Sequence, residues 1–218
     1  MFKPATSVLL GLAASAVMVG PPTATAGIDR NNRCLGYAER YAVEQQTKFE
    51  VVFSKVVQGD RFFYGCAFSS ERARRLPGQS CCEVDVVSGF QLQGRYVAYR
   101  SLNQEPAATQ ANDTLYVYDV KTGQIKVQAT AVPPGNTPGS TFVSSIVLKA
   151  NGSVAWIGGA QTGQSGADYQ VQIDDTVGPG PVTVDQGTDI APDSLAKASD
   201  GLSIYWIQGG VAKNAPLQ

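Results

Sequence analysis

Residues 195–210 read LAKASDGLSIYWIQGG, and this stretch decides the fold. Asp200-Gly201 is among the strongest short signals for a β-hairpin, because a tight turn needs positive φ at its central positions. The strand that follows is apolar on both alternating faces, with Leu202, Ile204 and Trp206 on one and Tyr205 and Ile207 on the other. A strand with two apolar faces belongs inside a layered stack of sheets.

The same pattern occurs four times along the chain. It consists of an apolar run, a polar turn that ends in glycine, and an apolar strand that closes on a large aromatic residue. The other three segments are FEVVFSKVVQGDRFFYGC from Phe49, FQLQGRYVAYRS from Phe90 and IVLKANGSVAWIGG from Ile146. The turn glycines are Gly59, Gly94, Gly152 and Gly201, and the aromatic residues that follow are Tyr64, Tyr99, Trp156 and Trp206. We predict four equivalent hairpin turns, each leading to an aromatic residue in the core.

Further hairpins are predicted between these segments. Residues 115–119 and 124–129 flank a turn at 120–123, and residues 169–174 and 182–185 flank the loop Gly178-Pro179-Gly180-Pro181. Each unit thus supplies about four short strands in about 48 residues, the size of one propeller blade. The sequence predicts an all-β, propeller-like domain of about four blades, with an irregular β-sandwich as the alternative. Residues 37–46 fit either a helical turn or a strand that closes the ring.

Two segments carry a resemblance to a known family. The Asp200-Gly201 turn leading into Ser203-Ile204-Tyr205-Trp206 resembles the turn of WD40-like and TolB-type propeller repeats of exported bacterial proteins. Residues 115–123, LYVYDVKTG, resemble the outer hairpin of such blades. The resemblance covers residues 49–218, and it implies a binding scaffold more often than an enzyme.

The N-terminus has the features of a secretory signal. Lys3 precedes an apolar run from Val8 to Val19, which is followed by Gly20-Pro21-Pro22 and the small-residue site Ala24-Thr25-Ala26. This pattern predicts a signal peptide at residues 1–26 and a single mature domain at residues 27–218. The apolar run is too short to span a bilayer, which needs about 20 residues. We expect a secreted or periplasmic protein with no transmembrane segment.

All four cysteines, Cys34, Cys66, Cys81 and Cys82, lie in the mature region. In an oxidising compartment they predict two disulfides, because their spacing fits no zinc site. A bond between the adjacent Cys81 and Cys82 would require a strained ring. The expected partner of Cys34 is therefore Cys81 or Cys82.

Composition excludes several kinds of function. The chain has no histidine, which rules out a Ser-His-Asp triad and any histidine-based zinc site. A net charge of −1 argues against nucleic acid as a partner. The basic run Arg72, Arg74 and Arg75 is interpreted as the solvated face of a hairpin.

One segment is strongly acidic. It contains Asp174, Asp175, Asp185, Asp189, Asp193 and Asp200, opposed only by Lys197. Such carboxylates suit calcium or a carboxylate-dependent hydrolase, but neither a ligand loop nor a convergent acid pair is recognisable. We predict no cofactor and no catalytic residue, with calcium as a minor possibility.

Two functional hypotheses follow. The first is an exported binding or protein-interaction module for an unidentified protein or glycan, with contacts made by the polar loops at 103–112 and 161–168. The second is a small hydrolase or lyase that uses a carboxylate pair on extracellular polysaccharide. The sequence favours the binding module over an enzyme.

Overall fold

The computed structural model describes residues 32–79, 86–103, 110–133, 139–161, 166–176 and 178–218. The predicted signal at 1–26 lies outside these residues. One helix and fifteen strands are present in the described part of the chain. No helix among the described residues is long and apolar enough to cross a membrane.

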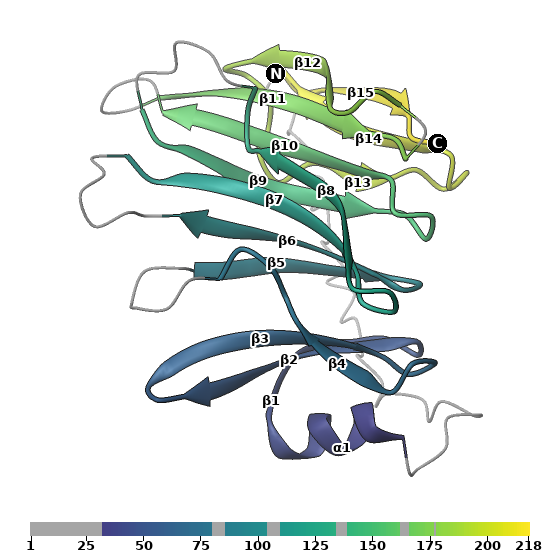
Figure 1. The fold of residues 1–218 in the computed structure, drawn as a ribbon. Coiled ribbons are helices and arrows are strands. Elements are labelled where there is room, and N and C mark those ends of the chain that lie inside the picture. The colour runs from purple at the N-terminus through teal and green to yellow at the C-terminus, as the bar shows by residue number, and fades with distance from the viewer. Residues whose placement is uncertain (1–31, 80–85, 104–109, 134–138, 162–165, 177) are drawn as a thin grey trace, which may run out of the picture.

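The strands form four successive antiparallel meanders, which we call blades 1 to 4 (Figure 1). Blade 1 contains β1 (Ala42–Gln46), β2 (Glu50–Val57), β3 (Asp60–Ala67) and β4 (Arg72–Arg75). Blade 2 contains β5 (Val86–Gln93), β6 (Tyr96–Asn103), β7 (Asn112–Asp119) and β8 (Gln124–Thr130). Blade 3 contains β9 (Thr141–Leu148), β10 (Val154–Gln161), β11 (Ala167–Asp174) and β12 (Val182–Gly187). Blade 4 contains β13 (Ala196–Lys197), β14 (Ser203–Gln208) and β15 (Val211–Pro216).

The blades pack face to face, because strands in the middle of the stack are apolar on both sides. In β6, Val97 and Tyr99 pack against blade 1, whereas Tyr96 and Ala98 pack against blade 3. In β10, Trp156 contributes to the core shared with blade 2, and Ile157 contributes to the core shared with blade 4. Three separate apolar cores therefore join the four blades.

The first strands of successive blades contact one another, β1 with β5, β5 with β9 and β9 with β13. They line the inner side of the arrangement, as expected for a propeller. Blades 2 and 3 are also joined by one parallel residue pair, Asn112 with Thr141. Blades 1 and 4 lie at opposite ends, and no described strand of one pairs with a strand of the other (Figure 1). The fold is thus an all-β, propeller-like arc of four blades whose sheets do not close.

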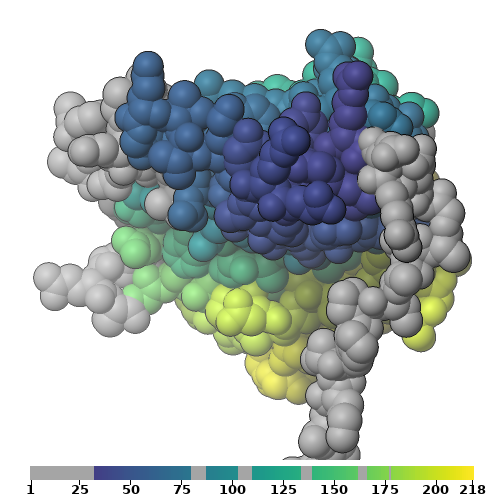
Figure 2. Space-filling model, turned by 90° about the horizontal axis from the view of Figure 1, so that it is seen from below, coloured from purple at the N-terminus to yellow at the C-terminus, as the bar shows by residue number. Residues whose placement is uncertain are grey.

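The helix α1 (Arg33–Arg40) covers the free face of blade 1. Its N-cap residue Asn32 accepts a hydrogen bond from the N–H of Cys34 and donates one to the carbonyl of Phe68. Tyr37 of the helix stacks on Phe53 of β2. Figure 2 looks onto this end of the arc, where the purple residues lie over the first blade. The ambiguous stretch at 37–46 is therefore the end of α1 followed by β1, and β1 pairs with β2 of its own blade instead of closing a ring.

Candidate functional site

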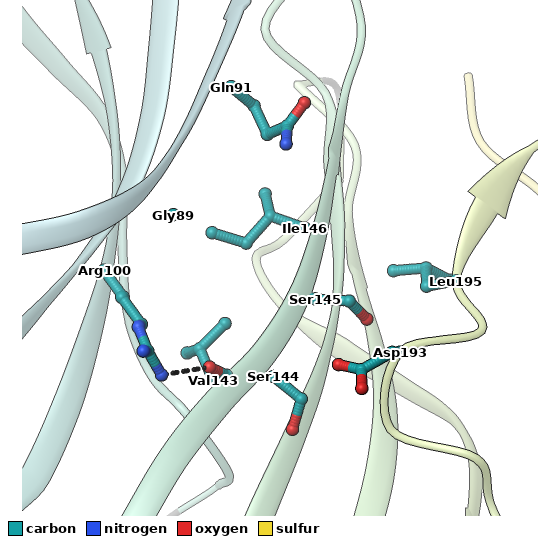
Figure 3. A pocket seen from close by; sticks show the side chains of 9 residues that line it. All are labelled: Gly89, Gln91, Arg100, Val143, Ser144, Ser145, Ile146, Asp193 and Leu195. Atoms are coloured by element: carbon teal, nitrogen blue, oxygen red, sulfur yellow. Dashed lines mark hydrogen bonds between the residues drawn. The ribbon is translucent and has the colours of Figure 1, made fainter. Parts of the chain in front are cut away.

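Two adjoining hollows lie along the inner side of the arc. The first, of about 340 Å³, is lined by residues of β5, β6 and β9 and of the segment before β13 (Figure 3). The second, of about 320 Å³, shares Gln91, Ile146 and Leu195 with the first and extends to Lys197 of β13. Together they form one groove between the first strands of blades 2, 3 and 4, which we call the inner groove.

A β-bulge shapes the wall of this groove in blade 2. The register of β5 against β6 shifts between Ser88 and Gln91, and Gly89 within the shift has φ 69°. A bulge bends its strand and redirects the neighbouring side chains, and positive φ favours glycine at the bend. Gln91 is exposed as a result and lines both hollows.

Arg100 of β6 is a fixed cation on the same wall. Its Nε donates to Ser88 Oγ at 2.8 Å, and its Nη1 donates to the carbonyl of Val143 at 2.7 Å. The same Nη1 lies 3.4 Å from Asp113 Oδ2. These bonds hold the guanidinium in place, yet 39% of the Arg100 side chain remains exposed. An anchored guanidinium that is partly exposed is suited to binding a carboxylate.

Asp113 supports Arg100 from inside the core. It is buried, and its Oδ2 also accepts the N–H of Val143 at 2.8 Å. Burial raises the pKa of Asp113, while the Val143 N–H and the charge of Arg100 act in the opposite direction. The carboxyl therefore fixes Arg100 and β9 relative to each other but does not reach the groove lining.

Asp193 lies on the opposite side of the groove from Arg100, across the residues of β9 (Figure 3). It is exposed, and it precedes β13 in a segment that is tied to β9 where Ser145 Oγ donates to the carbonyl of Pro192 at 2.9 Å. The groove thus presents a cation on one wall and an anion on the other, and the Gln91 side chain lines it farther along β5 (Figure 3). These charges suit a polar extended ligand, and among the described residues that line the groove Asp193 is the one carboxylate.

The four predicted turn glycines all lie between antiparallel strands. Three of them, Gly94, Gly152 and Gly201, join the first and second strands of blades 2, 3 and 4, whereas Gly59 joins the second and third strands of blade 1, so the predicted equivalence does not extend to Gly59. Their φ values are 96° at Gly59, 73° at Gly94, 93° at Gly152 and 67° at Gly201. Tyr99, Trp156 and Trp206 are buried in the three cores between blades, and Tyr64 stacks on Phe53 in blade 1. Neither the glycines nor these aromatic residues line the inner groove.

The disulfide pairing differs from the expected one. Cys34 of α1 is bonded to Cys66 of β3, with the two Cα atoms 5.6 Å apart, and not to Cys81 or Cys82. The expectation failed because nothing in the sequence showed that Cys34 lies on a helix that packs over β3. The same bond takes Cys66, so the predicted bonds of Cys81 and Cys82 to Cys34 and Cys66 are wrong, and Cys81 and Cys82 themselves lie outside the described residues.

The aspartates of the acidic segment make separate contacts and do not form one cluster. Asp185 accepts from Trp206 and Lys213, Asp189 accepts from Gln208, and Asp200 accepts from the backbone of its own turn. Within the described ranges, no group of three or more cysteine or acidic residues is placed to hold a metal ion. Much of the two predicted contact loops, at 104–109 and 162–165, lies outside those ranges.

The arginines of the basic run in β4 make different contacts. Arg74 Nη2 donates to the carbonyl of Lys121, and Arg75 Nη2 donates to the carbonyl of Gln79. The guanidinium of Arg75 also lies 3.9 Å from the ring centre of Phe62. Arg72 is exposed beside a polar hollow at the end of α1.

Sequence reasoning did not identify Arg100, Asp113 or Gln91 as site residues. Arg100 directly follows the predicted core residue Tyr99, and a charged residue at the end of a doubly apolar strand was the available signal. The partner Asp113 follows the loop after β6, and its closeness to Arg100 depends on the register of β6 with β7.

The fold class is that of a propeller-like β protein. No model of a known protein family matches the chain, and no curated protein matches it in sequence. Among solved structures, the tricorn protease is similar over 75% of this chain with a TM-score of 0.48 and 11% identity. TolB from Acinetobacter baumannii is similar over 72% of this chain with a TM-score of 0.38 and 15% identity. The chain spans 14% of the first protein and 34% of the second.

Proposed function

We propose that this chain is an exported, non-catalytic interaction module that binds an extended polypeptide segment of a partner in its inner groove. The observation that carries the proposal is the Arg100 side chain, which is partly exposed although three protein oxygens hold its guanidinium, with Asp193 on the opposite side of the groove. A peptide offers carboxylate, ammonium and amide groups that match these charges and Gln91.

A glycan fits the groove less well. Sugar rings are commonly bound by stacking on aromatic side chains, whose large flat faces are both apolar and polarisable. The described residues that line the inner groove include no aromatic residue. The export part of the proposal rests on the predicted signal at residues 1–26 and on the Cys34–Cys66 bond, since disulfides persist in oxidising compartments.

Panning a phage-displayed random peptide library against the purified protein tests the binding site. We expect selected peptides whose affinity falls by about tenfold or more in Asp193→Lys, because one charged wall of the groove is reversed. Asp168→Lys is the matched control, since Asp168 is an exposed acid on β11 that does not line the groove. Equal loss in both variants would show that only net charge matters and would contradict the proposed site.

The absence of catalysis needs its own assay. The protein is incubated with panels of glycans and peptides, alone and with Asp185, Asp189 and Asp193 each changed to Asn. We expect no turnover. Turnover that is abolished by any one of these substitutions would show an enzyme and overturn the non-catalytic part of the proposal.

A further inference from the structure

The outer edge of blade 4 differs from the outer edges of the other blades. The third strands β3, β7 and β11 each pair with a fourth strand, whereas no described strand pairs with β15 on the side away from β14. The backbone direction follows from the register with β14. The Leu217 N–H donates to the Leu202 carbonyl, so the odd-numbered residues of β15 direct their backbone N–H and C=O groups toward β14. The even-numbered Ala212 and Asn214 direct their N–H and C=O groups away from β14, toward the open edge.

A second observation concerns the neighbouring blade. A groove of about 310 Å³ lies between β15 and the outer strand of blade 3, and Ile173, Val182, Val184 and Ala215 are among its lining residues. Val182 pairs with Ile173, whose side chain packs toward blade 4. No described strand of blade 4 covers these valines, and Val182 is 52% exposed and Val184 is 39% exposed. We call this the outer groove.

The charged residues around the outer groove indicate which kind of polypeptide segment it favours. Asp174 ends β11 and Asp175 follows it beside the outer groove, whereas Asp185 lies on β12. Among the described residues, Lys213 forms an ion pair with Asp185. Lys213 is already committed, because it donates to Asp185 at 3.1 Å. The surroundings of the groove are therefore net negative and favour a segment with basic residues near its ends.

From the open edge, the apolar groove beside it and this charge, we propose that β15 receives a β-strand from a partner polypeptide as the fourth strand of blade 4. The main chain of that strand bonds to Ala212 and Asn214, its alternate apolar side chains cover Val182 and Val184, and a basic residue lies toward Asp175. Pro216 has no N–H to donate, so it ends the ladder at that side. This surface is separate from the inner groove and requires no peptide there.

The probe is the fluorescein-labelled peptide Lys-Val-Thr-Val-Thr-Val-Lys, measured by fluorescence anisotropy with the full chain. Two further peptides are N-methylated, one on every Val and the other on every Thr. In a strand the N–H groups of alternate residues point to opposite edges, and an added strand uses only one edge. We expect the unmodified peptide to bind, one methylated peptide to lose about tenfold or more in affinity, and the other to bind as before.

Variants of the protein locate the site. Val184→Asn and Asn214→Pro are expected to weaken binding. Val56→Asn, at an exposed valine of β2, and Asp193→Lys in the inner groove are expected to leave it unchanged. The proposal is overturned if the unmodified peptide fails to bind or if both methylated peptides bind equally well. It is also overturned if sedimentation shows a dimer that Asn214→Pro dissociates, because a second copy of the chain would then occupy the edge.

Discussion

Trp206 donates its indole N–H to Asp185 Oδ2 at 2.7 Å, across the boundary between blades 4 and 3. The same oxygen lies 3.1 Å from Lys213 Nζ. Burial alone would raise the pKa of Asp185, but the hydrogen bonds from Trp206, Lys213 and the Gln186 N–H outweigh it, and the pKa lies below its usual range. One carboxylate of the acidic segment thus joins two blades.

We expect Asp185→Ala to lower the free energy of unfolding by about 1–3 kcal/mol, because the buried indole N–H loses its acceptor. Urea unfolding at neutral pH measures this. Because the folded pKa is depressed, the contribution of Asp185 is present above its unfolded pKa and is lost as the pH falls through the folded value. Asp168→Ala, an exposed acid without such bonds, should leave stability nearly unchanged, and an equal effect of both substitutions would contradict the interpretation.

Glu50 should make stability fall as pH rises. Its side chain is fully buried on β2, neither carboxyl oxygen has a hydrogen-bond partner among the described residues, and burial together with the charge of Asp119 raises its pKa to about 8. In the folded state the Glu50 carboxyl keeps its proton up to about pH 8, whereas in the unfolded state it loses the proton above about pH 4.5. Stability from the neutral carboxyl is therefore complete below about pH 4.5 and declines up to about pH 8.

Glu50→Gln tests this dependence by urea unfolding at pH 5 and pH 9. The amide cannot ionise, so we expect the variant to lose less stability than the wild type between these two values, with a difference on the order of a few kcal/mol. Glu39→Gln, on the exposed surface of α1, is the matched control. Parallel stability curves for Glu50→Gln and the wild type would refute the assignment.

The Cys34–Cys66 bond closes a separation of 32 residues and should contribute roughly 3–4 kcal/mol by restricting the unfolded chain. We expect the Cys34→Ala and Cys66→Ala double substitution to remove about this amount and to make the wild type and the variant equally stable under reducing conditions. Non-reducing peptide mapping provides the direct check. A Cys34 peptide linked to Cys81 or Cys82 would disprove the pairing.

Gly158→Ala should destabilise the junction of blades 2 and 3. A Cβ at this position would collide with the main-chain oxygen of Ala131, which also accepts the indole N–H of Trp156 at 2.8 Å. Overpacking of this kind costs about 1–3 kcal/mol, and displacement of the oxygen would weaken the indole bond as well. Thermal unfolding measures the loss. Gly36→Ala is the control, because a Cβ there meets nothing within 4 Å.

The repeat could be predicted from the sequence because its signals are local. An Asn-Gly or Asp-Gly turn and a strand with two apolar faces are properties of ten or so neighbouring residues, and both report on blade packing. The inner groove could not be predicted in the same way. Arg100 meets Val143 only after blades 2 and 3 have packed, and the distance between them in the chain is 43 residues.

The helix and the disulfide show the same limit. The helix at 33–40 has only eight residues, and its N-cap Asn32 also donates to the carbonyl of Phe68, a contact far along the chain that no local pattern shows. The pairing of Cys34 with Cys66 follows from that placement.

The helix α1 gives the arc a direction. Its apolar residues seal the first blade, whereas Tyr205 on the far face of blade 4 is 40% exposed. A further layer that packs on the far face of blade 4 would therefore cover Tyr205, whereas a layer at the other end would meet α1 before it met the first blade.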